Sequence, residues 1–401
     1  MTGADDRPEE LWPPTALESA VSAVGADTIR YRADLPAGAE GDELARIFRQ
    51  YSVTAPDFES PEYTEALDKA TRQAPSGRIL RRMGSPLTGY QTVMADGPAS
   101  PAWKTVDLIN ASHTGATPSI NINGWMDVGA HETVKLFEFQ QQHPDQYLIM
   151  AGTEHCRMLA TSPEARLGQR PIGDTRFPYD EIIISWFDRF LCDEPDAWKP
   201  MPKVQVFLMG ANTWLTGESW PLPDTETRTL FLASGKAANT LWGDGALVPA
   251  ARGAGIDEFI ADPHNPVQSL GGDLGTHDPI CTDQRVIECR ADVLVYSTPV
   301  LTEPVTIAGD VTAELHVSAD VEDADVFVKL VDVYPDGTAY NLADTCLRLR
   351  YRDSFEHPAK LVPGEIHRVQ IGGITTANYF PAGHRIRIEI AGSNFPLADR
   401  N

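Results

Sequence analysis

The sequence predicts an α/β region followed by an all-β region, and three observations support this fold class. Between residues 102 and 222, continuous apolar runs alternate with amphipathic stretches of helical spacing, which is typical of a parallel sheet covered by helices. Between residues 223 and 401, apolar residues recur at every second position in short runs separated by turns, which predicts a β-sandwich of the jelly-roll type. Residues 1–101 show helical spacing interrupted by proline and glycine, so we expect a helical subdomain there.

The α/β region supplies two strands and two helices in alternation. Residues 118–124 (PSINING) and 146–152 (QYLIMAG) are short apolar runs, as expected of strands that are buried on both faces. Residues 131–142 and 179–192 carry apolar side chains at three- and four-residue spacing, which predicts helices. The second helix contains large apolar side chains that we expect in the core, namely Trp186, Phe187, Phe190 and Leu191.

Alternating runs define the all-β region. In residues 311–317 (VTAELHV), the apolar side chains share one face of the expected strand and the polar ones share the other. Residues 346–352 (CLRLRYR) and 384–390 (HRIRIEI) repeat this two-residue period, so we expect both to be strands. The arginines of CLRLRYR could bind an anion, but local ion pairs are the expected arrangement in so acidic a chain. The acidic stretch 319–325 (ADVEDAD) is expected to be a solvated turn, with a calcium site as the alternative.

The composition limits the classes of partner and cofactor. Lys and Arg total 33 and Asp and Glu total 57, which gives a net charge of -24 at pH 7. Because this charge repels phosphate backbones and anionic lipids, we expect no nucleic-acid or membrane partner, and a neutral or cationic small-molecule substrate. The five cysteines form no Cys-x-x-Cys pair and no His-Glu-x-x-His pattern occurs, so no metal or other cofactor is expected. The first residues lack the parts of a secretion signal, so we expect a cytoplasmic protein.

Two polar residues directly follow the two predicted strands of the α/β region. Asp127 lies in GWMDVG, and His155 lies in GTEHC, 28 residues later. The carboxyl ends of parallel strands meet at one edge of a sheet, where catalytic groups converge. A buried carboxylate there can accept the Nδ1 proton of an imidazole and stabilise the imidazolium that forms when Nε2 takes a proton from a nucleophile. We therefore expect Asp127 and His155 to form a catalytic pair, in the order in which α/β-hydrolases carry these two residues.

Each of these residues also has a simpler interpretation. Asp127 could cap the N-terminus of the helix that follows it, where a carboxylate satisfies free N–H groups and interacts with the helix dipole. His155 could be an ordinary loop histidine. Cys156 could be a thiol nucleophile, although neighbouring loop side chains tend to point apart and a base needs its partner within hydrogen-bond reach. His113 and His131 have no metal ligand at suitable spacing and are expected to be surface or core histidines.

Several segments, taken in order, resemble the cocaine-esterase and X-Pro dipeptidyl-peptidase family of α/β-hydrolases, the CocE/NonD hydrolases. They are GWMDVG, GTEH, SWFDRFL, VQVFLMGANTWLTGESWPLPDT, KLVDVYPDG, LRLRYRD and AGSNFPLADRN, and the similarity extends from about residue 103 to the C-terminus. The resemblance implies a serine hydrolase in which Asp127 and His155 are members of a Ser-His-Asp triad. It assigns three domains: a helical cap (1–101), the C-terminal half of an α/β-hydrolase core (102–222) and a jelly-roll β-sandwich (223–401).

The nucleophile of that family has no counterpart in this sequence. The family places its serine in a Gly-x-Ser-x-Gly elbow upstream of the cap, and no such pattern occurs here. Gly84 and Ser85 are adjacent in GSPLTG, which lacks the spacing that exposes the hydroxyl. We therefore expect the chain to begin inside the cap, to be truncated at both ends relative to the family, and to lack the oxyanion-hole donors.

Two functional interpretations follow. In the first, the chain is part of a serine hydrolase that cleaves ester or amide bonds, in acyl or X-Pro dipeptidyl substrates, and its jelly-roll domain supports assembly into a homo-oligomer. In the second, the chain is an inactive fragment or homologue that serves binding or assembly only. In both, this chain alone is expected to be inactive, because Asp127 and His155 without a nucleophile give little covalent catalysis.

Overall fold

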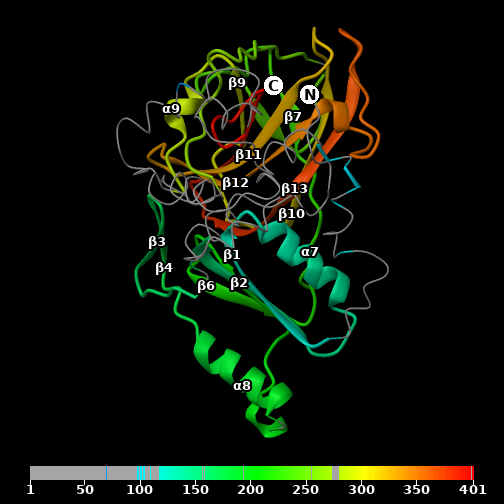
Figure 1. Ribbon diagram of the computed structural model, residues 1–401. Coiled ribbons are helices and arrows are strands. Elements are labelled where there is room, and N and C mark those ends of the chain that lie inside the picture. The colour runs from blue at the N-terminus through cyan, green and yellow to red at the C-terminus, as the bar shows by residue number, and fades with distance from the viewer. Residues whose placement is uncertain are drawn as a thin grey trace, which may run out of the picture. The chain divides into compact units, whose positions relative to one another are not determined.

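The computed structural model divides the chain into two compact units. One comprises Met1–Asp107 with Asp353–Pro358, and the other comprises Leu108–Arg352 with Ala359–Asn401. The structure describes residues 117–401 except 156, 158, 193, 254, 273–279 and 399, together with isolated positions before residue 117 (Figure 1). The predicted helical cap at 1–101 therefore lies, apart from those positions, outside the described residues. The domain boundaries given above remain predictions.

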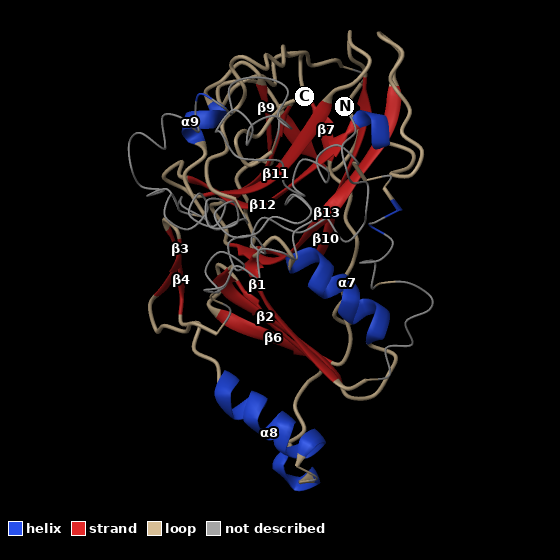
Figure 2. Cartoon of the chain, viewed as in Figure 1, coloured by secondary structure: helices blue, strands red, loops and turns tan. Residues whose placement is uncertain are grey.

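The part of the chain that the structure describes is mostly sheet with few helices (Figure 2). Its first half contains a four-stranded sheet in the order β1-β2-β5-β6. The strands are β1 (Ser119–Met126), β2 (Gln146–Glu154), β5 (Val204–Leu208) and β6 (Thr213–Gly217). β1, β2 and β5 are parallel, and β6 is antiparallel to β5. The predictions of strands at 118–124 and 146–152 and of a parallel sheet are confirmed.

Helix α7 (Ala130–Gln140) follows β1 and confirms the first predicted helix. Its buried residues Ala130, Val134 and Phe137 recur at helical spacing and pack into the same apolar core as the strands of the four-stranded sheet. The helix thus begins just after β1 and packs against the four-stranded sheet. A short hairpin of β3 (Ala165–Leu167) and β4 (Arg170–Gly173) lies between β2 and the next helix in the chain.

Helix α8 (Tyr179–Leu191) is also present, but the prediction that its aromatic and aliphatic cluster lies in the core is wrong in part. Trp186 is buried and packs edge-on against Tyr147. Phe187 and Leu191 are 51% and 75% exposed. The helix is covered on one side only, because it projects beyond the four-stranded sheet (Figure 1) and is followed by a single 3-10 turn at Pro195–Ala197.

The second half of the described chain forms a six-stranded sheet and a two-stranded ribbon. The strands are β7 (Phe231–Ala233), β8 (Ala246–Val248), β9 (Val293–Ser297), β10 (Val305–Val317), β11 (Asp325–Val333), β12 (Ala339–Arg348), β13 (His367–Phe380) and β14 (Arg385–Ala391). The sheet has the order β12-β11-β14-β9-β8-β7, and β10 pairs with β13 in the ribbon. Side chains of the sheet and ribbon share one apolar core, in which Leu315, Val328 and Ile371 are buried. The alternation predicted for residues 311–317 is confirmed, since only its apolar face is turned to that core.

The strand predicted over residues 346–352 is wrong in its second half. β12 ends at Arg348, and Leu349–Tyr351 forms a 3-10 turn. The change of direction coincides with a backbone bond from the Leu349 N–H to the Ala324 carbonyl oxygen. The expected ion pairs are confirmed for two of the arginines, because Arg348 contacts Asp325 at 2.8 Å and Arg350 contacts Asp323 at 2.6 Å.

The strand predicted over residues 384–390 is confirmed as β14, but both of its faces are buried. Ile386 and Ile390 face the apolar core, while Arg387 and Glu389 are also buried, at 6% and 3% exposure. The four-residue helix α9 (Arg285–Glu288) covers this second face, where Glu288 binds Arg387 at 2.6 Å. No helix among the described residues is long and apolar enough to cross a membrane.

Candidate active site

Asp127 occupies the turn between β1 and α7. Its backbone carbonyl accepts the Ala130 N–H at 3.0 Å, and its Oδ1 accepts the Gly129 N–H at 2.7 Å. The N-cap position of α7 is Gly129, so Asp127 itself is not the cap residue of the helix. One carboxylate oxygen of Asp127 is therefore used to hold the turn, and the other is free to serve a second partner.

That second partner is His155, the first residue after β2. The Nδ1 atom of His155 lies 2.7 Å from Oδ2 of Asp127. The backbone N–H of His155 also donates to the carbonyl oxygen of Met126 at 3.1 Å, which ties the end of β2 to the end of β1. The two sequence-predicted site residues are thus brought together at the carboxyl edge of the parallel strands.

The contact fixes the chemistry that the imidazole can perform. A carboxylate only accepts hydrogen bonds, so Nδ1 of His155 must donate, and Nε2 carries the lone pair when the ring is neutral. The Asp127 side chain is 7% exposed, whereas the His155 side chain is 43% exposed. The pair therefore combines a shielded carboxylate with an accessible base, as proton transfer to and from a bound reactant requires.

Asn123 supports this pair and was missed by the sequence analysis. Its Nδ2 atom donates to Thr133 Oγ1 at 2.9 Å and, more weakly, to Asp127 Oδ1 at 3.4 Å. This polar side chain is buried in the otherwise apolar strand β1. A polar residue within the apolar segment NING was the signal available in the sequence, because a buried polar group needs hydrogen-bond partners. Asn123 links the carboxylate of Asp127 to the second turn of α7.

A hollow lies beside Asp127, between the start of α7 and strands β12 and β13. Its lining includes Trp125, Asp127, His131, Asp344 and Thr375. Trp125 is buried and donates its ring N–H to the Phe207 carbonyl oxygen, so it packs in the core beside the site. His131, expected only as a surface or core histidine, is half-buried and contacts Thr375 Oγ1 at 2.7 Å. His113 and Cys156 lie outside the described residues.

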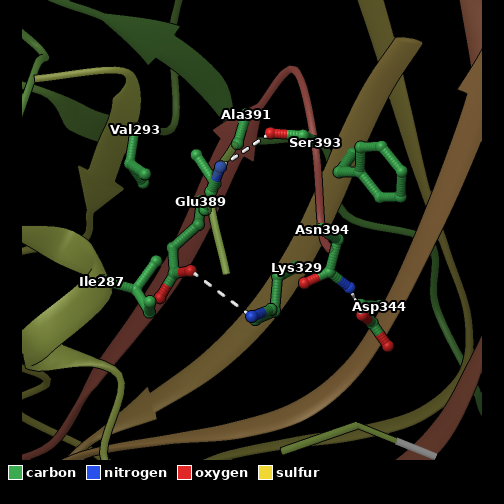
Figure 3. Close-up of a pocket in the computed structure, with 10 residues that line it drawn as sticks. Ile287, Val293, Lys329, Asp344, Glu389, Ala391, Ser393 and Asn394 are labelled. Atoms are coloured by element: carbon green, nitrogen blue, oxygen red, sulfur yellow. Dashed lines mark hydrogen bonds and ion pairs between the residues drawn. The ribbon is translucent and has the colours of Figure 1, made fainter. Parts of the chain in front are cut away.

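A second cavity lies between α9 and strands β11 and β14 (Figure 3), and Asp344 lines both this cavity and the hollow beside Asp127. Lys329 and Glu389 approach each other there at 3.9 Å, and Asn394 binds Asp344 at 2.8 Å. Burial raises the pKa of Glu389 to about 8, a carboxylate at Glu288 adds to that increase, and Lys329 opposes it. The cavity contains no nucleophile and base in contact, so we assign it no catalytic role.

A metal-binding cluster is absent from the described residues, and one of their four cysteines is buried. No group of three or more His, Cys, Asp and Glu side chains in residues 117–401, outside the gaps named above, is arranged to hold a metal ion. Burial raises the pKa of the Cys281 thiol to about 12, which leaves it protonated and unreactive at neutral pH. In the acidic stretch 319–325, Glu322, Asp323 and Asp325 each form an ion pair.

The sequence of residues 196–401 matches the family model of the X-Pro dipeptidyl-peptidase C-terminal non-catalytic domain. Over 306 residues, the chain is 39% identical to cocaine esterase of Rhodococcus sp. (strain MB1 Bresler), in an alignment that covers 75% of this chain and 53% of that protein. The chain belongs to the cocaine-esterase and X-Pro dipeptidyl-peptidase family, the CocE/NonD hydrolases. It spans about half the length of this curated relative.

Two solved structures share the fold of this chain. An aminopeptidase from a marine sediment Thaumarchaeota archaeon matches with a TM-score of 0.72 and 24% identity, covering 84% of this CocE/NonD chain and 57% of that chain. An α-amino acid ester hydrolase matches with a TM-score of 0.61 and 24% identity, covering 96% of this chain and 58% of that chain. At this level of identity the likeness concerns the fold alone.

Proposed function

We propose that this chain is part of a serine hydrolase in which Asp127 and His155 are two members of a Ser-His-Asp triad. The observation that carries the proposal is the 2.7 Å contact between Asp127 Oδ2 and His155 Nδ1 at the ends of adjacent parallel strands. In this proposal the four-stranded sheet with α7 is the C-terminal half of an α/β-hydrolase core, and the six-stranded sheet with its ribbon is a jelly-roll domain.

The chemistry follows from the roles that the contact gives the two residues. A serine hydroxyl attacks the substrate carbonyl carbon, and Nε2 of His155 accepts the hydroxyl proton as the Oγ–C bond forms. Asp127 stabilises the resulting imidazolium through the Nδ1–H bond. His155 then gives the proton to the leaving oxygen or nitrogen as its bond to the acyl carbon breaks. Water repeats these steps to release the acid and restore the serine.

The nucleophile is outside this chain in our proposal. None of the 401 residues lies in a Gly-x-Ser-x-Gly pattern, so neither the elbow nor its adjacent oxyanion donor is supplied by this sequence. We infer that this chain alone is inactive, and that the substrate carries an ester or amide bond, in acyl or X-Pro dipeptidyl compounds. The similarity to cocaine esterase supports the ester, and the net charge of -24 favours a neutral or cationic molecule over nucleic acid or membranes.

A second candidate function is a binding or assembly module without catalysis. The absence of the serine elbow in this sequence favours it, because the Asp127–His155 pair gives little covalent catalysis alone. Assembly into a homo-oligomer through the C-terminal domain fits either function.

A fluorophosphonate probe and the genomic context test this proposal. We expect no labelling of the 401-residue chain, and labelling at any of its serines would contradict an absent nucleophile. A longer reading frame that encodes Gly-x-Ser-x-Gly should yield a product that reacts with the probe and hydrolyses 4-nitrophenyl esters. In that product, Asp127→Asn should lower kcat by on the order of 10⁴-fold. Stop codons or an unrelated gene upstream, or full activity in the variant, would contradict the hydrolase and favour the binding module.

A further inference from the structure

Helix α7 is clamped to the β10–β13 ribbon by four side chains. His131 and Lys135 lie four residues apart and therefore share one face of α7, whose N-terminal end adjoins β10 and β13 (Figure 1). Asp310 of β10 and Thr375 of β13 are directly paired across the ribbon. His131 Nδ1 lies 2.7 Å from Thr375 Oγ1, and Lys135 Nζ lies 2.6 Å from Asp310 Oδ2. Two neighbouring side chains of the helix thus bind two side chains that are paired across the ribbon.

The directions of the hydrogen bonds in this clamp are determined by its carboxylate. The Thr375 hydroxyl donates its only proton to Asp310 Oδ1 at 2.5 Å, because a carboxylate can only accept. Thr375 Oγ1 must therefore accept from His131, whose Nδ1 carries a proton in both ring charge states. Burial alone would raise the pKa of Asp310, but hydrogen bonds from Lys135 and Thr375 outweigh it and hold this pKa below its usual value. Asp310 therefore remains ionised at neutral pH. His131 donates to Thr375, and Thr375 donates to Asp310.

The clamp acts on the segment that carries Asp127. The carboxylate of Asp127 is bonded to the Gly129 N–H, and its carbonyl oxygen to the Ala130 N–H, so the position of Asp127 follows the first turn of α7. Val134 and Phe137 hold a neighbouring side of the helix in the core. His131 is adjacent to Ala130 and is held from the ribbon side. The rotation of α7 about its axis is thus restrained from two sides.

We propose that His131 is a positioning residue, through which the ribbon of the domain described as non-catalytic orients Asp127 toward His155. This inference rests on the proposed function of the Asp127–His155 pair. The C-terminal domain then contributes to catalysis without touching the reacting atoms. His131, Thr375 and Asp127 all line the hollow beside the site, which places the clamp in direct contact with the space next to the carboxylate.

Nuclear magnetic resonance of the 401-residue chain with ¹⁵N-labelled histidine tests the inference without requiring activity. The readout is the Nδ1–H resonance of His155, which persists only while the proton is held by Asp127. We expect Thr375→Val and Lys135→Met to broaden this resonance beyond detection. Glu314→Gln is the matched control, because Glu314 pairs with Arg368 across the same ribbon at 2.6 Å and both side chains are exposed. It should leave the resonance unchanged.

Circular dichroism and thermal unfolding show whether each variant is folded, and Lys135→Met alters a side chain that is 32% exposed, so it should fold. A persistent His155 resonance in folded Lys135→Met or folded Thr375→Val would overturn the inference. Equal loss in Glu314→Gln would overturn it too, since any change in the ribbon would then suffice. If Asp127→Asn also leaves the resonance in place, the proposed pair fails rather than the clamp.

Discussion

Gly124 of β1 lies so close to β2 that a Cβ atom added to it would stand 2.5 Å from the carbonyl oxygen of Thr153. These strands carry Asp127 and His155 at their ends. Gly124→Ala must push the strands apart, because the obstacle is backbone and cannot rotate away. We expect a loss of about 1–3 kcal/mol in the free energy of unfolding. Gly372→Ala is the control, since its Cβ would meet only a Thr312 methyl at 3.9 Å.

Urea unfolding of the two glycine variants checks this expectation. A Gly124→Ala protein as stable as Gly372→Ala would show that the two strands can separate without cost. Such a result would also weaken the idea that the spacing of the strand ends is fixed.

Removing Arg170 from its buried ion pair with Asp332 should lower the free energy of unfolding, because Asp332 would stay buried without this cation. Arg170 is completely buried and donates to Asp332 at 3.0 Å and to Asn378 at 2.7 Å, joining the β3–β4 hairpin to β11 and β13. Arg170→Met leaves Asp332 buried with one cationic partner removed, which typically costs about 3–5 kcal/mol. Glu314→Gln breaks an exposed pair and should cost less than about 1 kcal/mol. Equal midpoints in urea for both variants would contradict this difference.

The stability of the chain should fall between about pH 4.5 and pH 8 because of Glu389. Burial first, and then Glu288, raise the pKa of Glu389 from 4.5 to about 8, against the opposing effect of Lys329 (Figure 3). Below pH 4.5 this residue is protonated in both the folded and the unfolded chain and imposes no penalty. As pH rises, the unfolded chain releases the proton first, so this contribution to stability is lost progressively until about pH 8.

Thermal unfolding of Glu389→Gln at a series of pH values checks this expectation. The variant should match the wild type near pH 4.5 and be the more stable of the two at pH 8. Glu322→Gln, which alters an exposed carboxylate paired with Lys360, is the control. A pH dependence in Glu389→Gln equal to that of the wild type would contradict the buried, protonated carboxyl group.

Local patterns allowed the sequence to predict the elements that position the candidate site. The apolar runs of β1 and β2 and the spacing of Val134 and Phe137 depend on near neighbours, so they predicted strands and a helix correctly. Asp127 and His155 could be paired because both follow parallel strands. The contact of His131 with Thr375 could not be predicted, since these residues are separated by 244 positions and meet only through the packing of α7 on the ribbon.

The periodicity of the sequence also did not reveal that some charged residues are buried. Arg387 and Glu389 alternate with isoleucines, a pattern that is typical of a solvent-facing side. They are buried because Glu288, 99 residues before Arg387, is brought over that face of the sheet. The exposure of Phe187 and Leu191 is the converse case, since an apolar helical stripe says nothing about whether a neighbouring element covers it.

The most direct test of the account is the tautomer of His155, read from imidazole ¹⁵N chemical shifts of the neutral ring. We predict a proton on Nδ1 and a bare Nε2 in the wild-type chain, because Asp127 accepts from Nδ1 at 2.7 Å. In Asp127→Asn, the amide can donate to Nδ1 instead, and the proton should move to Nε2. A wild-type ring protonated on Nε2, or identical spectra for the two proteins, would contradict the proposed pair.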